Sequence, residues 1–407
     1  MICSASSSNT GVVSLLIRRC TAAFLMLAAS VVYTDALALQ SAPATSSLCK
    51  AGAKVAQEIH EEKFVMIGGI EQWVTINGKD CANPVVLIVH GGPGNPMTPF
   101  GDAIYGSWTK QFTIVQWDQR GAGRTYGRNR LLAERDSSKW TPEQLEELPP
   151  LTIARLTQDG VEVASYAAAR MNQRKVILVG GSWGSALGVH MAKARPDLFH
   201  AYMGTGQMVH YTENELSTYE TLLGLARAAK DTKTVTALEA LGSPPWSNPR
   251  AFGIVRKATR TYEAKTATAP PKSWWNPGAL YATPEAQLDY EAGEEYSFLQ
   301  FVGFKGNGML STIDLHKLGA TFEMPVFLLQ GSEDLVTTPA VAKRYFDTIT
   351  APTKEFILLP KTGHDPNETM LDSQLLTLTL LVLPHLKLPN GASSHRRTRG
   401  NPGYSNE

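Results

Sequence analysis

The sequence predicts an α/β fold, a mostly parallel sheet with helices on both faces and an inserted helical cap. Two observations predict the sheet: short apolar runs suited to buried strands alternate with segments of helical periodicity, and several of the runs lead into glycine-rich turns. A third predicts the insertion, because residues 207–312 contain helical stretches rich in Ala, Glu and Leu and no clear buried strand.

Two stretches of alternating strands and helices are expected, one on each side of the insertion. The first opens with a hairpin that turns at Gly68-Gly69, where residues of alternating polarity lie on both sides. Its elements are the hairpin Lys63–Gly78, strands Pro84–His90 and Phe112–Asp118, a helix over Leu151–Met171 capped by Thr152, and strands Val176–Val179 and His200–Gly206. The second contains a strand at Pro325–Asp334, a helix opened by Pro339, a strand at Glu355–Pro360 and a final helix to about Leu386.

The core is therefore expected in two parts, residues 39–206 and 313–388, separated by the insertion at 207–312. We expect the insertion to form a cap over the carboxyl ends of the strands, where the active sites of α/β proteins form. A helical domain packed elsewhere on the core is the alternative.

Composition is that of a globular enzyme, with 43% hydrophobic and 18% charged residues. The length of 407 residues suits one large domain with an insertion, or two domains. A net charge of +1 gives no electrostatic argument for binding nucleic acid or an anionic membrane. The sequence carries no signal of oligomeric state.

The first 38 residues have the order of a secretory signal peptide. Arg18-Arg19 precede the apolar run "CTAAFLMLAASVVY", and Ala36-Leu37-Ala38 forms an A-x-A cleavage pattern. The run is too short to span a bilayer comfortably; an uncleaved anchor and a twin-arginine route are the alternatives. We therefore expect cleavage after Ala38, no stable membrane span afterwards, and a secreted or periplasmic protein.

Two cysteines, Cys49 and Cys81, remain after that cleavage, one on each side of an N-terminal strand region. In an exported chain they can pair, and two unpaired thiols are the alternative. Residues 389–407 are polar, glycine-rich and without periodicity, which predicts a disordered tail.

The stretch "VILVGGSWGSALG" (Val176–Gly188) carries the first catalytic signal. A buried strand ends in glycines on both sides of Ser182, and a helix follows. So tight a turn needs glycine where a Cβ would collide with neighbouring backbone, and it presents the serine hydroxyl at the carboxyl end of the strand. This G-x-S-x-G nucleophile elbow is the signature of the α/β-hydrolase fold; an ordinary glycine-rich turn is the alternative.

A nucleophilic serine needs a base and an orienting acid, which in this fold follow in the order Ser, Asp or Glu, His. The motif "GSED" ends one predicted strand and "KTGHDP" ends the next, so Asp334 and His364 should share the sheet edge with Ser182. We predict a catalytic triad of these three residues. Glu333 is the alternative acid.

An oxyanion hole needs two backbone N–H groups aimed at the developing negative charge. We expect one from Trp183, at the start of the helix, and the other from Gly92 in "HGGPG" (His90–Gly94). The sequence contains no cluster of His, Cys and Asp with metal-ligand spacing, so neither a metal nor another cofactor is expected.

Three motifs together resemble the prolyl aminopeptidase (proline iminopeptidase) group of serine peptidases: "HGGPG", "DQRGAGRT" (Asp118–Thr125) and "GGSWGS" (Gly180–Ser185). "GSED" and "GHDP" fit that group's acid and histidine positions, and the resemblance covers about residues 63–205 and 312–386. It implies removal of an N-terminal residue, often proline. It also implies a buried ion pair between Asp118 and Arg120 that holds the oxyanion loop.

The cap departs from that group's pattern, because the Trp-Glu pair that usually helps to bind the substrate's amino terminus does not occur between residues 207 and 312. Cap glutamates remain the candidates for gripping a free amine, and those selected are Glu213, Glu220, Glu291 and Glu294.

These observations predict an exported serine hydrolase that works through an acyl-enzyme and releases N-terminal residues such as proline from small peptides. A carboxylesterase with the same triad, acting on small esters, is the alternative. A non-catalytic binding protein on this fold is a third reading, and the complete triad argues against it.

Overall fold

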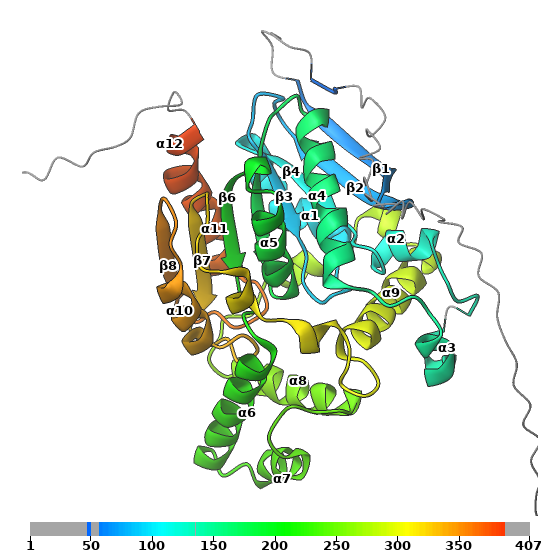
Figure 1. The fold of residues 1–407 in the computed structure, drawn as a ribbon, viewed down its shortest axis with the longest axis vertical. Coiled ribbons are helices and arrows are strands. Elements are labelled where there is room, and N and C mark those ends of the chain that lie inside the picture. Colours follow the sequence, from blue (N-terminus) through cyan, green and yellow to red (C-terminus); the bar gives the residue numbers. More distant parts are fainter. Residues whose placement is uncertain (1–46, 50–56, 135, 387–407) are drawn as a thin grey trace, which may run out of the picture. The chain divides into compact units, whose positions relative to one another are not determined.

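The computed structural model describes residues 47–49, 57–134 and 136–386, and Figure 1 shows its course. The expected signal peptide (1–38) and tail (389–407) lie outside the described residues. An eight-stranded sheet runs in the order β1-β2-β4-β3-β5-β6-β7-β8. Its strands are β1 (Ile59–Ile67), β2 (Ile70–Gly78), β3 (Val85–Val89), β4 (Thr113–Trp117), β5 (Val176–Gly181), β6 (Phe199–Thr205), β7 (Val326–Gly331) and β8 (Lys354–Leu359).

The first two strands form the predicted hairpin, and the other strands form the predicted parallel sheet. The antiparallel pairing of β1 with β2 turns at Gly68 and Gly69, whose φ angles of 57° and 80° suit glycine. β2 also pairs antiparallel with β4, and from β4 to β8 every neighbouring pair is parallel.

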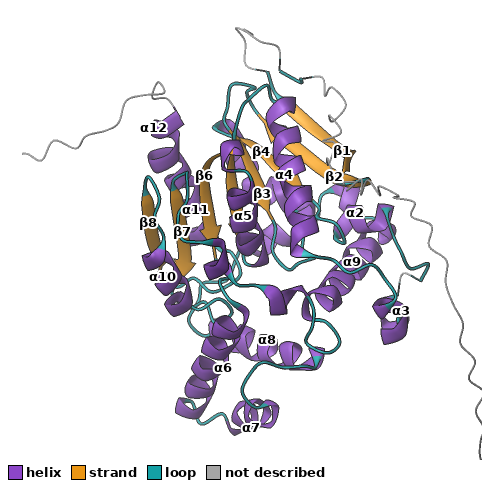
Figure 2. Cartoon of the chain, viewed as in Figure 1, coloured by secondary structure: helices purple, strands orange, loops and turns teal. Residues whose placement is uncertain are grey.

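Helices cover both faces of the sheet (Figure 2). Successive side chains of β3 point to opposite faces of the sheet, and both faces are buried. Leu87 packs in one cluster with α4 and α5, and Val86 packs in another with α1 and α11. The helices are α1 (Gly101–Tyr105), α2 (Gly123–Arg128), α3 (Pro142–Glu146), α4 (Ile153–Arg170), α5 (Trp183–Ala194), α6 (Tyr211–Ala228), α7 (Thr232–Leu241), α8 (Pro249–Glu263), α9 (Pro284–Val302), α10 (Pro339–Thr348), α11 (Glu368–Thr377) and α12 (Leu383–Leu386).

The insertion between β6 and β7 is helical and contains α6 to α9. The first three of these helices have a buried cluster of their own, which includes Leu222, Leu238 and Val255. The fourth, α9, packs instead against α2, where Gly293 lies close to the backbone of Gly123. The insertion is thus joined to the core through α9 and carries α6 to α8 beyond the carboxyl ends of the strands (Figure 1).

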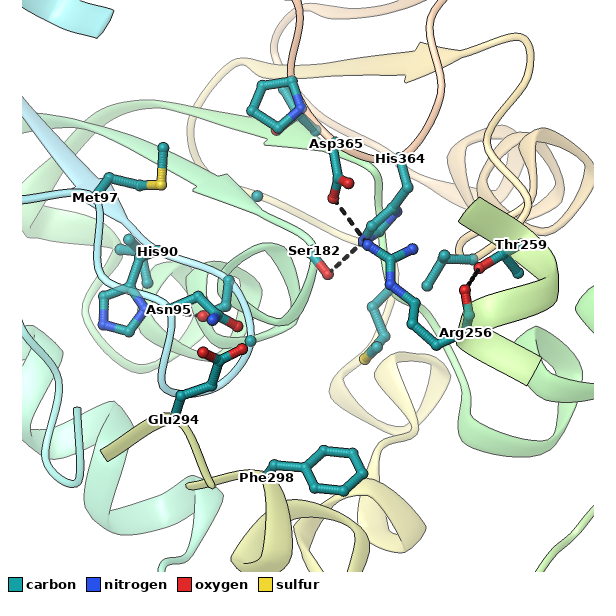
Figure 3. A pocket seen from close by; sticks show the side chains of 18 of the residues that line it. His90, Asn95, Met97, Ser182, Arg256, Thr259, Glu294, Phe298, His364 and Asp365 are labelled. Atoms are coloured by element: carbon teal, nitrogen blue, oxygen red, sulfur yellow. Dashed lines mark hydrogen bonds and ion pairs between the residues drawn. The ribbon is translucent and has the colours of Figure 1, made fainter. Parts of the chain in front are cut away.

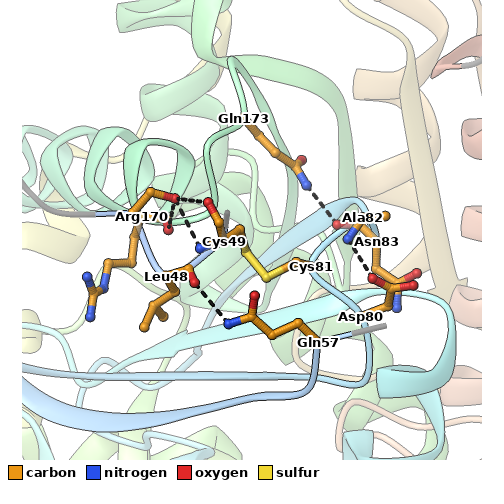
Figure 4. Close-up of a disulfide and its surroundings, with 10 residues drawn as sticks. Leu48, Cys49, Gln57, Asp80, Cys81, Ala82, Asn83, Arg170 and Gln173 are labelled. Atoms are coloured by element: carbon orange, nitrogen blue, oxygen red, sulfur yellow. Dashed lines mark hydrogen bonds between the residues drawn. A yellow bond between two sulfur atoms is a disulfide. The ribbon is translucent and has the colours of Figure 1, made fainter. Parts of the chain in front are cut away.

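Cys49 and Cys81 form a disulfide, with their Cα atoms 5.6 Å apart (Figure 4). The pairing that the sequence left open is therefore made in the structure. Around it, the N–H of Leu48 donates to the carbonyl of Arg170 at the end of α4, at 2.9 Å. The disulfide connects the chain before β1 to the turn that leads into β3.

Among the described residues, one helical run, Glu368–Leu386, is long and apolar enough to cross a membrane by length and composition alone. Core helices can share both properties, so this is weak evidence. Met370, Leu371, Leu378 and Val382 of this run are buried against the sheet.

Candidate active site

Ser182 lies between β5 and α5 in a backbone conformation that few residues adopt, with φ 53° and ψ −125°. Its N–H donates to the carbonyl of Thr205 on β6, at 2.9 Å. A Cβ on Gly184 would collide with the carbonyl oxygen of Val89, and one on Gly180 would collide with the carbonyl of Gly184. The glycines of the motif thus let the turn pass close to β3, and the turn presents the serine at the sheet edge.

Two side chains from later strands reach Ser182 in the predicted order. The Nε2 atom of His364 lies 2.9 Å from the Oγ of Ser182. On the other side of the ring, Nδ1 lies 3.1 Å from both carboxylate oxygens of Asp334. The structure therefore brings the three predicted residues into one hydrogen-bonded chain, whose serine and histidine appear in Figure 3.

Asp334 is buried and held by several donors. Its carboxylate accepts from the N–H of Val336 at 2.9 Å, and from both the N–H and the hydroxyl of Thr337 at 2.8 Å. Burial alone would raise the pKa of Asp334, but the charge of His364 and these hydrogen bonds outweigh burial and lower it. Glu333, the alternative acid, bonds to Ser332 instead of the histidine.

His364 is buried too, with 6% of its side chain exposed. Burial alone would lower the pKa of the imidazole, but the charge and hydrogen bond of Asp334 outweigh burial and raise it. The pair is therefore arranged to stabilise an imidazolium, the form that the ring takes after accepting a proton from serine.

The loop after β3 is fixed by a buried network around Gln119. The side-chain amide of Gln119 donates to the carbonyl of His90 at 2.9 Å, and its oxygen accepts from the indole N–H of Trp183 at 3.0 Å. The backbone N–H of Gln119 donates to Nε2 of His90 at 3.1 Å, while Nδ1 of that ring bonds to the carbonyl of Gly91. Burial lowers the pKa of His90 to about 4, so the ring is neutral in this network.

The prediction that Asp118 and Arg120 form an ion pair is wrong. Arg120 pairs with Asp159 on α4, at 2.8 Å. Asp118 is buried, forms no ion pair among the described residues, and accepts from the hydroxyl of Thr98 at 2.5 Å and from the backbone N–H of Arg124 at 2.8 Å. Burial raises its pKa to about 7. The oxyanion loop is thus tied down by Gln119, which lies between the two expected partners and which the sequence did not single out.

Gly92 and Trp183, the predicted oxyanion donors, both lie beside Ser182. Trp183 is the first residue of α5, and Gly92, with a φ of 107°, lines the same pocket as the serine. Gly91 approaches even more closely, since a Cβ there would lie 3.1 Å from the Cβ of Ser182. In the part of the chain that the structure describes, the N–H groups of Gly92 and Trp183 donate to no other group.

Ser182 and His364 open into a cavity of about 530 Å³ between the sheet edge and the helices of the insertion. Apolar side chains make up much of the lining, among them Met97, Phe298 and Phe301. A chamber of this size suits a ligand of a few residues.

Of the four glutamates selected from the sequence, two line a cavity in the structure and two do not. Glu294 lines the cavity, and Glu291 lines a smaller adjoining one. Glu213 pairs with Arg344 and His316 and is not among the lining residues, and exposed Glu220 does not line it either.

A fifth glutamate, Glu215, lines the cavity and was not selected. It forms no hydrogen bond or ion pair within the described ranges, and burial raises its pKa to about 8. Helical spacing could have pointed to it, because buried Thr218, Tyr219 and Leu222 follow it at three, four and seven residues.

Comparison with known proteins gives relatives over most of the chain. A family model described as "Serine aminopeptidase, S33" matches residues 80–369. A Bacillus subtilis (strain 168) protein named "Probable aminopeptidase YbaC" is 27% identical over 316 residues, 75% of this chain and 91% of its own. A "Probable proline iminopeptidase" of Leptolyngbya boryana is 24% identical, over 74% of this chain and 88% of its own.

Solved structures share the fold at lower identity. The crystal structure of a proline iminopeptidase from Mycobacterium smegmatis is 18% identical and covers 80% of this chain and 98% of its own, with a TM-score of 0.53. VinJ, also 18% identical, covers 78% of this chain and 97% of its own, with a TM-score of 0.54. These similarities confirm the predicted α/β-hydrolase fold.

Proposed function

This chain belongs to the serine aminopeptidase S33 family, and on that premise we propose that it is an exported aminopeptidase that releases N-terminal residues, such as proline, from small peptides through an acyl-enzyme. The observation that carries the proposal is the series of hydrogen bonds from Ser182 through His364 to Asp334 at the wall of the cavity. The relatives named as aminopeptidases support the substrate class.

Each residue of the triad has a defined role in this proposal. The Oγ of Ser182 attacks the carbonyl carbon of the first peptide bond while Nε2 of His364 takes its proton. Asp334 holds the other side of the ring and stabilises the imidazolium. His364 then gives that proton to the leaving nitrogen, the C–N bond breaks, and the first residue stays on the serine as an ester. Water, activated by the same histidine, hydrolyses this ester and frees the enzyme.

The negative charge that forms on the carbonyl oxygen needs donors that are already in place. We assign these to the N–H groups of Gly92 and Trp183, which flank the serine and have no other acceptor within the described residues. Gln119 helps to position both donors, because its side chain donates to the carbonyl of His90, just before the loop, and accepts from the indole N–H of Trp183.

A free amino terminus would be recognised by Glu215 and Glu294. Both carboxylates line the cavity, and neither has a hydrogen bond or ion pair in the parts of the chain that are described. Burial raises the pKa of Glu215 to about 8, so this group is protonated at neutral pH in the empty cavity; an ammonium group beside it would favour the carboxylate and pair with it. The apolar walls would accept a pyrrolidine or another small aliphatic side chain.

Free-amine and N-acetylated aminoacyl-4-nitroanilides, with p-nitrophenyl esters beside them, test this proposal. We expect the free-amine substrates to be hydrolysed roughly 10²-fold better than the acetylated ones, since an acetylated substrate loses the ion pair that its ammonium would make with these glutamates, worth roughly 3 kcal/mol. Glu215→Gln should raise KM for the free-amine substrate, while Glu220→Gln, on the same helix but outside the cavity, should not. A preference for blocked amides or simple esters would favour the carboxylesterase instead.

Export rests on the signal-peptide pattern of residues 1–38 and is supported by the disulfide. Disulfides persist in oxidising compartments and are rare in the cytosol of most organisms. Both Cys49 and Cys81 follow the expected cleavage site, so the disulfide would remain in the mature protein.

A further inference from the structure

The cavity wall formed by α8 carries two cations that the proposed function does not use. Arg256 and Arg260 both line the cavity, four residues apart and therefore on one face of the helix. The carboxylates Glu215 and Glu294 come from other helices, α6 and α9. Acidic and basic side chains thus line the cavity around Ser182 from different elements.

Arg256 lies beside the catalytic histidine. One of its terminal nitrogens, Nη2, binds the carboxylate of Asp365, the residue after His364, at 2.8 Å (Figure 3). The other, Nη1, is buried and has no hydrogen-bond partner within the described ranges. The side chain is 28% exposed, against 52% for Asp365, and its other acidic neighbour, Glu263 on the same helix, interacts with it only through space, so Arg256 has one hydrogen-bonded partner.

Arg260, one turn further along α8, has no ion pair among the described residues. It is exposed and also lines the cavity. Two guanidinium groups with unused donors on one wall form a suitable receptor for a carboxylate, whose two oxygens match the planar fork of arginine.

The chemistry of the site decides which part of a substrate meets this wall. His364 gives its proton to the leaving nitrogen, so the leaving group must lie on the histidine side of Ser182. That is the side of Arg256. Glu294 lies on the opposite side, because it packs against the oxyanion loop, where a Cβ on Gly94 would approach its Cα to 2.9 Å. The acyl residue with its amine would lie there.

We infer that Arg256, assisted by Arg260, binds a carboxylate on the leaving group and so directs the enzyme toward very short peptides or toward peptides with an acidic second residue. This inference rests on the proposed aminopeptidase activity and specifies its leaving-group side. The same carboxylate can come from the C-terminus of a dipeptide or from an Asp or Glu side chain. Both would present it about one residue from the scissile bond.

Two matched pairs of substrates separate these sources. The first compares a dipeptide Pro-Gly with its C-terminal amide, and the second compares Pro-Asp-amide with Pro-Asn-amide. We expect kcat/KM to be about tenfold or more higher for the charged member of at least one pair, the effect of one partly screened ion pair. The pair that shows the difference identifies the source of the carboxylate.

Variants on α8 then assign the difference to a residue. In Arg256→Gln the ratio within the responsive pair should fall toward one, and in Arg256→Lys it should be partly retained. Arg260→Gln should lower it less. Lys257→Gln, a neighbouring exposed cation that is not among the lining residues, should keep the full ratio. Because each ratio is taken within one protein, a loss of folded enzyme cancels.

The possible results are distinct. Hydrolysis of aminoacyl-anilides without a charged-substrate preference would overturn the inference and leave the aminopeptidase proposal standing. A preference that survives in the Arg256→Gln/Arg260→Gln double variant would also overturn it. No hydrolysis of any anilide or peptide would overturn the proposed function, and this inference with it.

Discussion

At the scale of single residues, the site depends on a few side chains held in costly states. Ser182 has a positive φ of 53°, and within the described ranges only Asn172, Lys230 and Lys361 share that property among non-glycine residues. Ser182 alone of these lies between a strand and a helix at the cavity. Backbone strain of this kind is retained where the surrounding structure enforces it, here to aim the hydroxyl at His364.

The raised pKa of His364 gives the activity a defined pH dependence. The ring must be neutral to accept a proton from Ser182, so kcat/KM should fall as pH decreases through the pKa of His364. Burial opposes the shift and the charge of Asp334 outweighs it, so the midpoint should lie above about 6.5, the ordinary value for histidine. An ester without an amine, such as p-nitrophenyl acetate, keeps substrate ionisation out of the profile.

Replacing the acid tests the cause of that shift. Asp334→Asn removes the charge, and the acidic limb of the residual activity should then move to lower pH. A limb that stays in place in Asp334→Asn would show that another group controls it.

Single residues also show which parts of the site could be predicted from the sequence. Ser182, Asp334 and His364 were predictable because each follows a recognisable strand, and the carboxyl ends of parallel strands meet at one edge. The ion-pair partner of Arg120 could not be predicted, because that partner, Asp159, lies far along the sequence on helix α4. Neighbouring charges in sequence give no information about which of them share a buried space.

At the scale of elements, the elbow connects β5 to α5 only because glycines lie where backbone segments meet. Gly184→Ala should therefore lower the free energy of unfolding by about 3 kcal/mol and reduce activity, since the added methyl meets the carbonyl of Val89. Gly224→Ala is the matched control: Gly224 lies within α6 with nothing near its Cβ position. That change should be neutral or stabilising by up to ~1 kcal/mol.

Urea denaturation of the two variants measures both effects. Similar stability losses at the two positions would contradict the packing account, because they would reflect helix propensity alone rather than the approach of α5 to β3.

The helices of the insertion were predictable as helices but not as walls of a site. Helical periodicity identifies a buried face, yet it does not say whether core or ligand covers that face. Glu215 lies on such a face of α6 and lines the cavity, whereas Glu213, two residues earlier, pairs with Arg344. Helical spacing puts the two glutamates on opposite faces of α6, and the packing of α6 in the structure shows which of those faces lines the cavity.

At the scale of the whole molecule, the described chain combines a sheet core, a helical insertion over its edge and a disulfide at the opposite end of the parallel strands from Ser182. The bond closes a sequence separation of 32 residues, which in a chain-entropy account contributes about 3–4 kcal/mol. It joins the chain before β1 to the turn before β3, whereas Ser182 follows the carboxyl end of the neighbouring parallel strand β5.

Removing the disulfide should therefore change stability and leave catalysis intact. The double variant Cys49→Ser/Cys81→Ser should lose about 2–4 kcal/mol of unfolding free energy and keep kcat/KM. Intact-mass analysis of the protein purified from its native host, with and without reductant and alkylation, checks the bond and the proposed start at Leu39. Two alkylatable thiols before reduction, or an uncleaved N-terminus, would contradict this account.

The central claim is that hydrolysis proceeds through Ser182, and the turnover of an aminoacyl-4-nitroanilide by Ser182→Ala tests it most directly. The account predicts a loss of roughly 10³–10⁶-fold in kcat with an unchanged melting temperature, and little further loss when His364→Ala is added, because the triad acts as a unit. Near-wild-type turnover by purified Ser182→Ala would contradict the account.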